Sequence, residues 1–304
     1  MNSKDESIIY HYTDDKGALG IIESQSLWAT HHRYLNDPNE LSIFRDVLNQ
    51  WRRSQKRISK SAWEWVEFLL GIYLSGQELD PESASLYDAY IVSFCNDDGD
   101  RLSQWRAYGK GGGYAIGFGR VELDQMLQQE EKNRTINEYF LTDVSYGKRD
   151  SIPNDLEPKM KQCMDSFRRV FRKPRGLSRR SVGEDREDGS RLLQECLCRF
   201  KDEGYREEKE VRALSFVSNP VHRFSKGLAS TSPRPKIYFR MVNNVQMPYI
   251  KLFEAKPLPL PIKKVVIGPC PDIELKRQSM RMVLAMNGID PEIIALSSIP
   301  YRGR

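Results

Sequence analysis

Two glutamates, Glu208 and Glu210, have the spacing of a paired carboxylate site. They lie in residues 207–212 (EEKEVR), which we expect at the start of a strand. Alternate residues of a strand point to the same face, so both carboxylates can face one reactant. A carboxylate held in one place stabilises a positive charge that develops in a transition state. Without further context, acids in this position are typical of a solvated strand entry.

A histidine and several aromatic residues form a second group of candidates. His11 lies in a predicted opening strand, within residues 10–13 (YHYT), where a histidine most often makes a structural hydrogen bond. Trp105 and Tyr108 fall on a predicted short helix, and Tyr114 follows three glycines. Together these rings can form an aromatic wall, although core packing is the simpler explanation for each ring alone.

Standard cofactor and metal motifs are absent from the sequence. It contains no Gly-rich phosphate loop and no nucleophile-elbow, metalloprotease or kinase signature. The five cysteines include no CxxC element, and the four histidines, at positions 11, 31, 32 and 222, lack zinc-finger spacing. We therefore predict no metal site. Reduced thiols, and a first segment without the apolar core of a signal peptide, indicate a cytoplasmic protein.

The elements that must position these residues alternate without a regular βαβ repeat. Strands are predicted at 7–12, 27–30, 90–95, 114–118, 141–146, 211–217, 236–241, 265–268 and 293–297. Helices are predicted at 14–24, 40–51, 60–74, 102–108, 121–132, 160–171, 189–201 and 273–286. This pattern favours an α+β fold, with mixed, mostly antiparallel sheets flanked by helices, in one domain over residues 1–304.

The charge balance is mild, but one segment is strongly basic. Lys and Arg total 47 and Asp and Glu 42, a net charge of +5, which does not by itself imply a nucleic-acid partner. Apolar stretches are too short to span a bilayer, so no membrane partner is expected. Residues 168–188 are interpreted as a mobile basic insertion. Its cations, which can contact nucleic acid, are Arg168, Arg169, Arg172, Lys173, Arg175, Arg179 and Arg180.

The order of short motifs along the chain resembles that of a bacterial family, domain-of-unknown-function family 2971. Each motif is weak, whereas the ordered series is more specific and covers nearly the full length. The motifs are YHYT at 10–13, LW at 27–28, NDPxE at 36–40, SFC at 93–95, WxxY at 105–108, GF at 117–118, EKEVR at 208–212, VIGP at 266–269 and SIPYR at 298–302.

That family is in turn similar to ADP-ribosyltransferases, and the similarity implies a core of that type and NAD as substrate. Those enzymes carry a His on the first strand, aromatic residues about the nicotinamide, and a Glu on a later strand, often in a Glu-x-Glu pair. The implied catalytic residues are Glu210, Glu208 and His11. The implied NAD-binding residues are His11, Tyr12, Thr13, Arg33, Tyr108, Tyr114 and Arg212.

The expected activity is therefore cleavage of the nicotinamide–ribose bond, by an ADP-ribosyltransferase or an NAD glycohydrolase. The cleavage develops an oxocarbenium-like cation, which Glu210 would stabilise, while Glu208 would orient the acceptor. The Ser-Thr-Ser-like element of such enzymes has only a partial counterpart at 27–30 (LWAT). A toxin or anti-phage defence effector is the biological role that this activity suggests.

Two alternatives stay open at this point. Asp37, Glu207 and Lys209 have the residue types of a Mg²⁺-dependent nuclease, in which two acids hold the ion and the Lys steadies the attacked phosphate. The basic insertion would then grip the nucleic acid. The other alternative is a non-catalytic module of a defence system that binds nucleic acid or protein.

Overall fold

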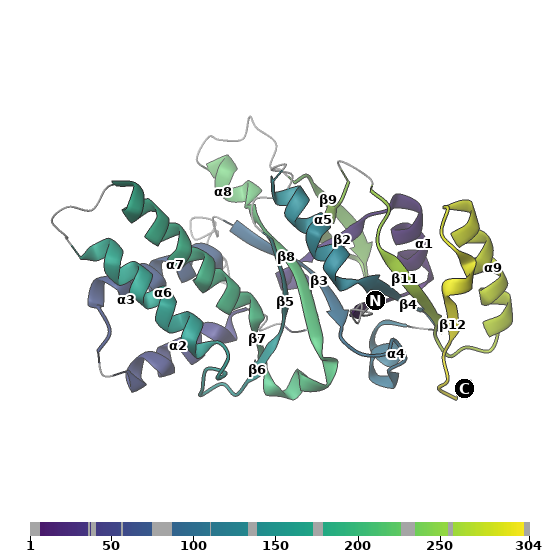
Figure 1. Cartoon of the computed structure of the whole chain (residues 1–304), viewed down its shortest axis with the longest axis horizontal. Coiled ribbons are helices and arrows are strands. Elements are labelled where there is room, and N and C mark those ends of the chain that lie inside the picture. The colour runs from purple at the N-terminus through teal and green to yellow at the C-terminus, as the bar shows by residue number, and fades with distance from the viewer. Residues whose placement is uncertain are drawn as a thin grey trace, which may run out of the picture.

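One large β-sheet forms the centre of the protein, and helices pack against it (Figure 1). The computed structural model describes residues 7–35, 37, 41–55, 57–74, 87–109, 111–132, 139–172, 179–225, 235–254 and 258–300. The sheet has ten strands: β1 (Ile8–Thr13), β2 (Leu27–His31), β3 (Tyr87–Cys95), β4 (Tyr114–Gly119), β5 (Tyr139–Asp143), β8 (Glu210–Ser218), β9 (Ile237–Val242), β10 (Val245–Leu252), β11 (Ile262–Ile267) and β12 (Ile294–Leu296).

The spatial order of the strands is β12-β11-β4-β1-β3-β2-β10-β9, and β8 pairs with both β3 and β5. Only the β11–β12 pair of this sheet is parallel, among the strands that the structure describes. Two short strands, β6 (Ser145–Gly147) and β7 (Phe200–Asp202), form a separate parallel pair. The predicted mixed, mostly antiparallel α+β architecture is therefore confirmed.

Strand β3 connects the two halves of the sheet. Along one edge it pairs with β8 over its full length, from Tyr87 opposite Ser218 to Cys95 opposite Glu210. Along the other edge it pairs with two strands at separate places: with β1 at Cys95, and with β2 at Tyr90 and Ile91. Strands β1 and β2 therefore diverge from each other along β3.

The helices are α1 (Asp15–Ser24), α2 (Ile43–Ser54), α3 (Lys60–Leu74), α4 (Leu102–Tyr108), α5 (Arg120–Lys132), α6 (Glu157–Phe171), α7 (Arg179–Arg199), α8 (Pro220–Ser225) and α9 (Ile273–Met286). The 3₁₀ turns within the described residues are η1 (His32–Tyr34), η3 (Glu203–Glu208) and η4 (Pro291–Ile293). Helix α1 begins where predicted, because the Asp14 side chain accepts a 2.8 Å hydrogen bond from the Gly17 amide. None of the described helices combines the length and the apolar character needed to cross a bilayer.

Alternation along β3 divides the core between the two faces of the sheet. Val92 and Phe94 pack with residues of α1, α5 and α9 on what we call the Val92 face. Ile91 packs with α2, α3, α6 and α7 on the opposite face, which we call the Ser93 face. A third cluster, which includes Cys95 and Trp105 of α4, lies at the other end of the Ser93 face. Figure 1 shows α2, α3, α6 and α7 gathered at one end of the molecule and α1 and α9 at the other.

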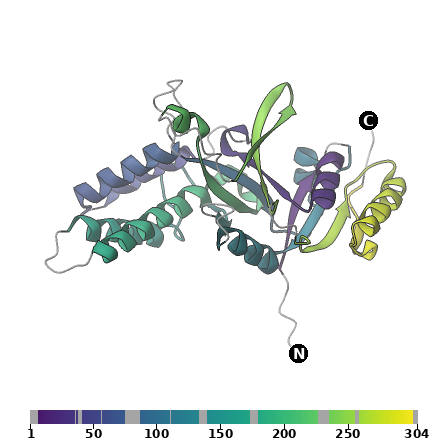
Figure 2. The same cartoon turned by 90° about the horizontal axis from the view of Figure 1, so that it is seen from above.

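Several segments differ from the sequence prediction, among them helix α8, which was not predicted. Helix α7 begins at Arg179 rather than at 189, so residues 179–188 of the expected insertion are helical, whereas 173–178 lie outside the described residues. The predicted strand 141–146 is two strands, β5 and β6, which belong to different sheets. Residues 200–201, predicted as a helix end, open strand β7, and 203–208 form a 3₁₀ turn. Strand β10, which was not predicted, forms a hairpin with β9 that stands out from the sheet in Figure 2.

Candidate active site

Glu210 lies at the first position of β8, opposite Cys95 of β3. Its side chain is therefore on the Ser93 face, and the residue is only 5% exposed. On this face the apolar cluster of α2, α3, α6 and α7 lies to one side of Glu210, and the cluster of Cys95 and Trp105 lies to the other. A polar network occupies the space between two apolar clusters.

Four hydrogen bonds fix the Glu210 carboxylate. Oε1 accepts from the Ser93 hydroxyl at 2.6 Å and from Nε of Arg212 at 2.9 Å. Oε2 accepts from Nζ of Lys201 at 2.7 Å and from a terminal nitrogen of Arg212 at 3.0 Å. Both oxygens thus accept hydrogen bonds, and Arg212 binds them as a bidentate donor. The backbone amide of Glu210 also donates to the Tyr146 hydroxyl at 2.8 Å.

These partners keep Glu210 ionised. Burial alone disfavours the charged form, but the positive charges of Arg212 and Lys201 and their hydrogen bonds outweigh it and lower the pKa of Glu210 to about 2. Arg212 is 0% exposed, and its remaining terminal nitrogen donates to the Cys198 carbonyl at the end of α7. Arg212 is therefore the buried counterion of Glu210, and solvent does not reach it in the role of pyrophosphate ligand that the resemblance implies.

Glu208 reaches the same network by a route that the sequence did not predict. It ends the 3₁₀ turn η3, and Lys209 follows in the left-handed conformation with φ of 43°. Glu208 and Glu210 therefore do not share a strand face as predicted. Their carboxylates nevertheless meet at one cation, because Nζ of Lys201 donates to both, at 2.6 and 2.7 Å. The Glu208 side chain is 24% exposed, so it forms the solvent-accessible side of the pair.

A second polar network borders the carboxylate pair. Arg101 donates to Asp97 at 3.0 Å and to the Glu207 carbonyl at 2.8 Å. The Tyr12 hydroxyl lies 3.3 Å from Asp97 and accepts from the Arg101 amide at 3.1 Å. The Cys95 thiol donates to Asp97 and to the Glu208 carbonyl. Burial, followed by the contact with Asp97, raises the pKa of Cys95 well above its usual value, so this thiol is a poor nucleophile.

His11 and Tyr114 lie on the other face of the sheet from Glu210. The His11 ring contacts Phe94 edge-on, with centroids 5.9 Å apart, and Phe94 belongs to the Val92 face. Nδ1 of His11 lies 2.9 Å from the Ser93 carbonyl oxygen, at the stretch of β3 where β1 and β2 have diverged. Tyr114 packs into the same core cluster as Phe94. Burial lowers the pKa of His11, which keeps its imidazole neutral.

The other residues implied to bind NAD are dispersed. Thr13 alternates with Tyr12 on β1 and thus faces the same side as His11, whereas Tyr12 faces the Ser93 side with Trp105. Tyr108 ends α4 and is 37% exposed. Arg33 is exposed in η1, which follows the C-terminal end of β2. The structure therefore joins Tyr12, Glu208 and Glu210 around one polar region, and it places His11, Thr13 and Tyr114 on the opposite face.

The residues of the nuclease alternative lack the strand geometry that such a site requires. Glu207 lies in η3 and Lys209 in the left-handed position after it, so they do not project from one face of a strand. Asp37 is buried in the segment that follows η1. Its neighbours 36 and 38 lie outside the described residues, so the predicted turn of 36–38 is not described either.

The basic segment does not present a purely basic surface where it is described. Arg169 forms a 2.7 Å ion pair with Asp185 of α7. The groove between α6 and α7 is lined by Gln162, Asp165, Ser166, Arg169, Asp188, Arg191, Leu192 and Glu195, which carry both signs of charge. Lys173 and Arg175 lie outside the described residues, as do the side chains of Arg179 and Arg180. Contact with nucleic acid through this segment stays a prediction.

Sequence inspection missed three members of the site: Ser93, Lys201 and Tyr146. In the sequence, Ser93 stood out only as part of the SFC motif. Its position opposite Arg212 follows from the register between β3 and β8. Lys201 lies on β7, within a segment predicted as helix. No local pattern marks a lysine that two glutamates will bind, since the three residues come together only when β7 and β8 are in place.

Comparison with known proteins supports the family resemblance over part of the chain. The sequence profile of the family described as "Protein of unknown function (DUF2971)" matches residues 104–213. This segment includes most of α4, strands β4 and β7, the turn η3 with Glu208, and the start of β8 with Glu210 and Arg212. No curated protein and no solved structure matches the chain.

Proposed function

We propose that this protein cleaves the nicotinamide–ribose bond of NAD, as an ADP-ribosyltransferase or an NAD glycohydrolase, with Glu210 as the group that stabilises the ribosyl cation. The observation that carries the proposal is the Glu210 carboxylate, which is ionised, held by Ser93, Lys201 and Arg212, and adjacent to the more exposed Glu208. A charge fixed in this way needs no reorganisation when the cation develops.

The reaction follows from the polarity of the bond that breaks. The C1′–nitrogen bond of NAD breaks with its electron pair going to nicotinamide, which leaves as a neutral molecule, and positive charge develops on the ribose. Glu210 stabilises that charge. Water or an acceptor then forms the new bond to C1′ and gives up a proton. In hydrolysis this proton passes to solvent water, whereas in transfer the solvent-accessible carboxylate of Glu208 orients the acceptor and takes its proton.

The remaining residues take roles that agree with their positions. Tyr108, 37% exposed at the end of α4, offers a ring against which nicotinamide can stack, and Tyr12 packs against Trp105 of the same helix. His11 is a positioning residue in this proposal, because its Nδ1 contacts the backbone of Ser93, whose hydroxyl donates to Glu210. We do not place His11 or Tyr114 against NAD.

The test is release of nicotinamide from NAD by the purified protein, followed by chromatography with and without EDTA. We expect release that EDTA does not abolish, and a loss on the order of a hundredfold in kcat for Glu210→Gln. Glu130→Gln is the matched control, because Glu130 is a second buried glutamate that lies outside this network. Glu210→Gln removes the counterion of Arg212, so Ser93→Ala, which keeps every ion pair, is measured alongside.

Ser93→Ala should lower kcat more than it raises KM, since Ser93 contacts the catalytic carboxylate rather than substrate. An active Glu210→Gln protein would remove the catalytic assignment. Release that depends entirely on added Mg²⁺, or hydrolysis of nucleic acid instead of NAD, would favour the nuclease alternative.

A further inference from the structure

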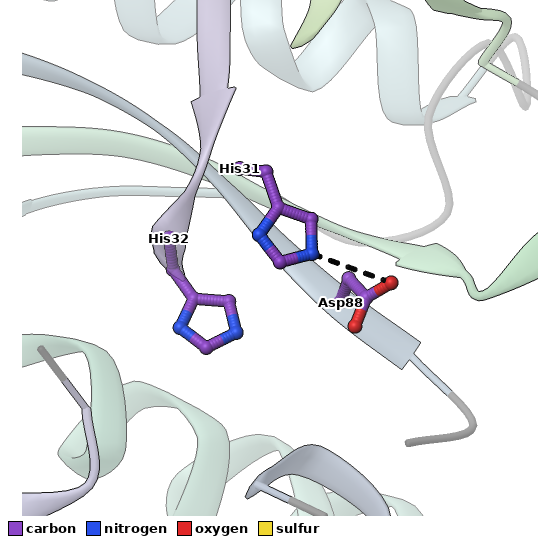
Figure 3. Close-up of side chains that lie close together, drawn as sticks. All are labelled: His31, His32 and Asp88. Carbon is purple, nitrogen blue, oxygen red and sulfur yellow. Dashed lines mark ion pairs between the residues drawn. The ribbon is translucent and has the colours of Figure 1, made fainter. Parts of the chain in front are cut away.

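His31, His32 and Asp88 form a buried cluster far from the carboxylate pair (Figure 3). His31 ends β2, His32 begins η1, and Asp88 lies near the start of β3. Their exposed fractions are 7%, 3% and 4%. Two imidazoles and a carboxylate from three elements thus meet in a place that water barely reaches, and their ligand atoms all lie within 4.8 Å of one another.

The separation between His31 and Asp88 suits a shared ion better than a direct hydrogen bond. Nε2 of His31 lies 3.5 Å from Oδ2 of Asp88, and Figure 3 shows the ring nitrogen and the carboxylate turned toward each other. Protein N–H···O hydrogen bonds are about 2.7–3.2 Å long. Two ligands on a tetrahedral zinc ion, with bonds of about 2.1 Å, lie about 3.4 Å apart, which is the edge of that tetrahedron.

We propose that His31, His32 and Asp88 bind one Zn²⁺ ion. Imidazole nitrogens with one carboxylate are a donor set that zinc takes in proteins, with water in the fourth position. The hard cations Mg²⁺ and Ca²⁺ prefer oxygen ligands, so two imidazoles select against them. A bound ion also compensates for the burial of a carboxylate.

The ion would join two elements that share little backbone pairing. Strands β2 and β3 are in register only at Thr30 opposite Ile91 and at His31 opposite Tyr90, among the described residues. A zinc ion held by residues of β2, η1 and β3 would link these elements through their side chains. The site is separate from the carboxylate pair, because Asp88 and Cys95 are seven positions apart on β3, about 23 Å of strand.

The orientation of the His31 ring supplies a direct signal for binding. Nδ1 of His31 accepts a hydrogen bond from the Arg33 amide at 3.2 Å, so Nε2 is the ring nitrogen that faces Asp88 and the cluster. An ion bound at Nε2 changes the surroundings of this ring, and the Arg33 amide resonance should therefore shift.

The experiment uses the whole chain after treatment with a chelator and its removal. Zinc is titrated by calorimetry, bound metal is counted by mass spectrometry, and backbone amides are followed by NMR. We expect one Zn²⁺ per chain, a higher melting temperature with zinc and a shifted Arg33 amide. Cobalt in place of zinc should give the visible spectrum of a site with nitrogen and oxygen ligands, without a thiolate charge-transfer band, since all five cysteines lie elsewhere and are buried.

Two variants remove one ligand each with little change in shape, His32→Gln and Asp88→Asn. Each should weaken zinc binding by on the order of a hundredfold or more. His222→Gln, which removes a histidine of α8, is the matched control and should bind zinc as the wild type does. Wild-type protein that binds no zinc, or zinc binding that both variants retain, would overturn the proposal. Either result leaves the NAD activity of the carboxylate pair to its own test.

Discussion

Substitution of Glu210 by Gln tests how the buried charges of this site are balanced. The change keeps the size of the side chain and removes its charge, so Arg212 and Lys201 lose the carboxylate that they both contact. Lys201 keeps Glu208 as a partner. Arg212 is left fully buried without the carboxylate charge that balanced its own, although it still donates to the Cys198 carbonyl. We therefore expect a large loss of stability.

The pKa of Glu210 sets the magnitude. The pKa falls from its usual 4.5 to about 2 in the folded protein, a difference worth about 3 kcal/mol of folding free energy. Loss of one partner of a buried ion pair costs about 3–5 kcal/mol, which agrees with this value. Because the folded pKa is lowered, the stabilisation is complete above pH 4.5 and disappears as the pH falls toward 2.

Urea unfolding at pH 7, followed by circular dichroism, measures this loss for Glu210→Gln. The double variant Glu210→Gln with Arg212→Met should recover about 2 kcal/mol relative to the sum of the single variants, since it no longer buries an uncompensated cation. Glu130→Gln should not lower stability at all. A loss below about 1 kcal/mol for Glu210→Gln, or strict additivity in the double variant, would refute the argument that the pair is a buried, mutually dependent charge network.

Three further predictions concern other parts of the structure. Burial raises the pKa of Glu130 to about 7. The stability of the wild type should therefore fall by about 3 kcal/mol relative to that of Glu130→Gln as the pH rises from 4.5 to 7, as measured by urea unfolding. A stability difference between the two proteins that does not change with pH would contradict this raised pKa. Glu208→Gln should spare hydrolysis of NAD but impair transfer to an acceptor, as seen by separate assays of the two products, and equal effects on both would argue against its role as base. Gly99→Ala should cost about 2 kcal/mol or more in the same unfolding assay, because Gly99 has φ of +83° and a Cβ there would overlap the Tyr10 ring, whereas Gly71→Ala, with no neighbour near its Cβ, should be tolerated.

Strand and helix positions were predictable wherever local chemistry decides them. The Asp14 cap and the runs of β-branched and aromatic residues in β3 and β8 are local signals, and the elements lie close to their predicted places. The segment 200–208 was not predictable in this way. Lys201 belongs to a strand that exists only because β6 lies beside it, and Lys209 turns the chain in a left-handed conformation.

The roles of Arg212 and His11 show why the site itself was harder to predict. Arg212 shares a strand face with Glu210, which the spacing indicates, but its complete burial depends on the end of α7, whose carbonyl at Cys198 it binds. The face of β1 on which His11 lies is fixed relative to its neighbours in the strand. Whether that face is also the face of Glu210 depends on the register of Tyr10 opposite Cys95 and of Cys95 opposite Glu210. Pairing between strands so far apart in sequence produces no local sequence pattern from which it could be predicted.

The order of the strands also determines when the sheet can be completed during synthesis. Leu27 of β2 pairs with Leu252 of β10, so 225 residues separate the synthesis of the two partners. At about 5–20 residues per second, β2 waits about 10–45 s before the strand that covers its outer edge leaves the ribosome. For that interval an apolar strand presents unpaired backbone groups to other chains. The arrangement that places β2 inside the finished sheet therefore makes the nascent protein prone to aggregation, and slow to fold through contacts between distant residues.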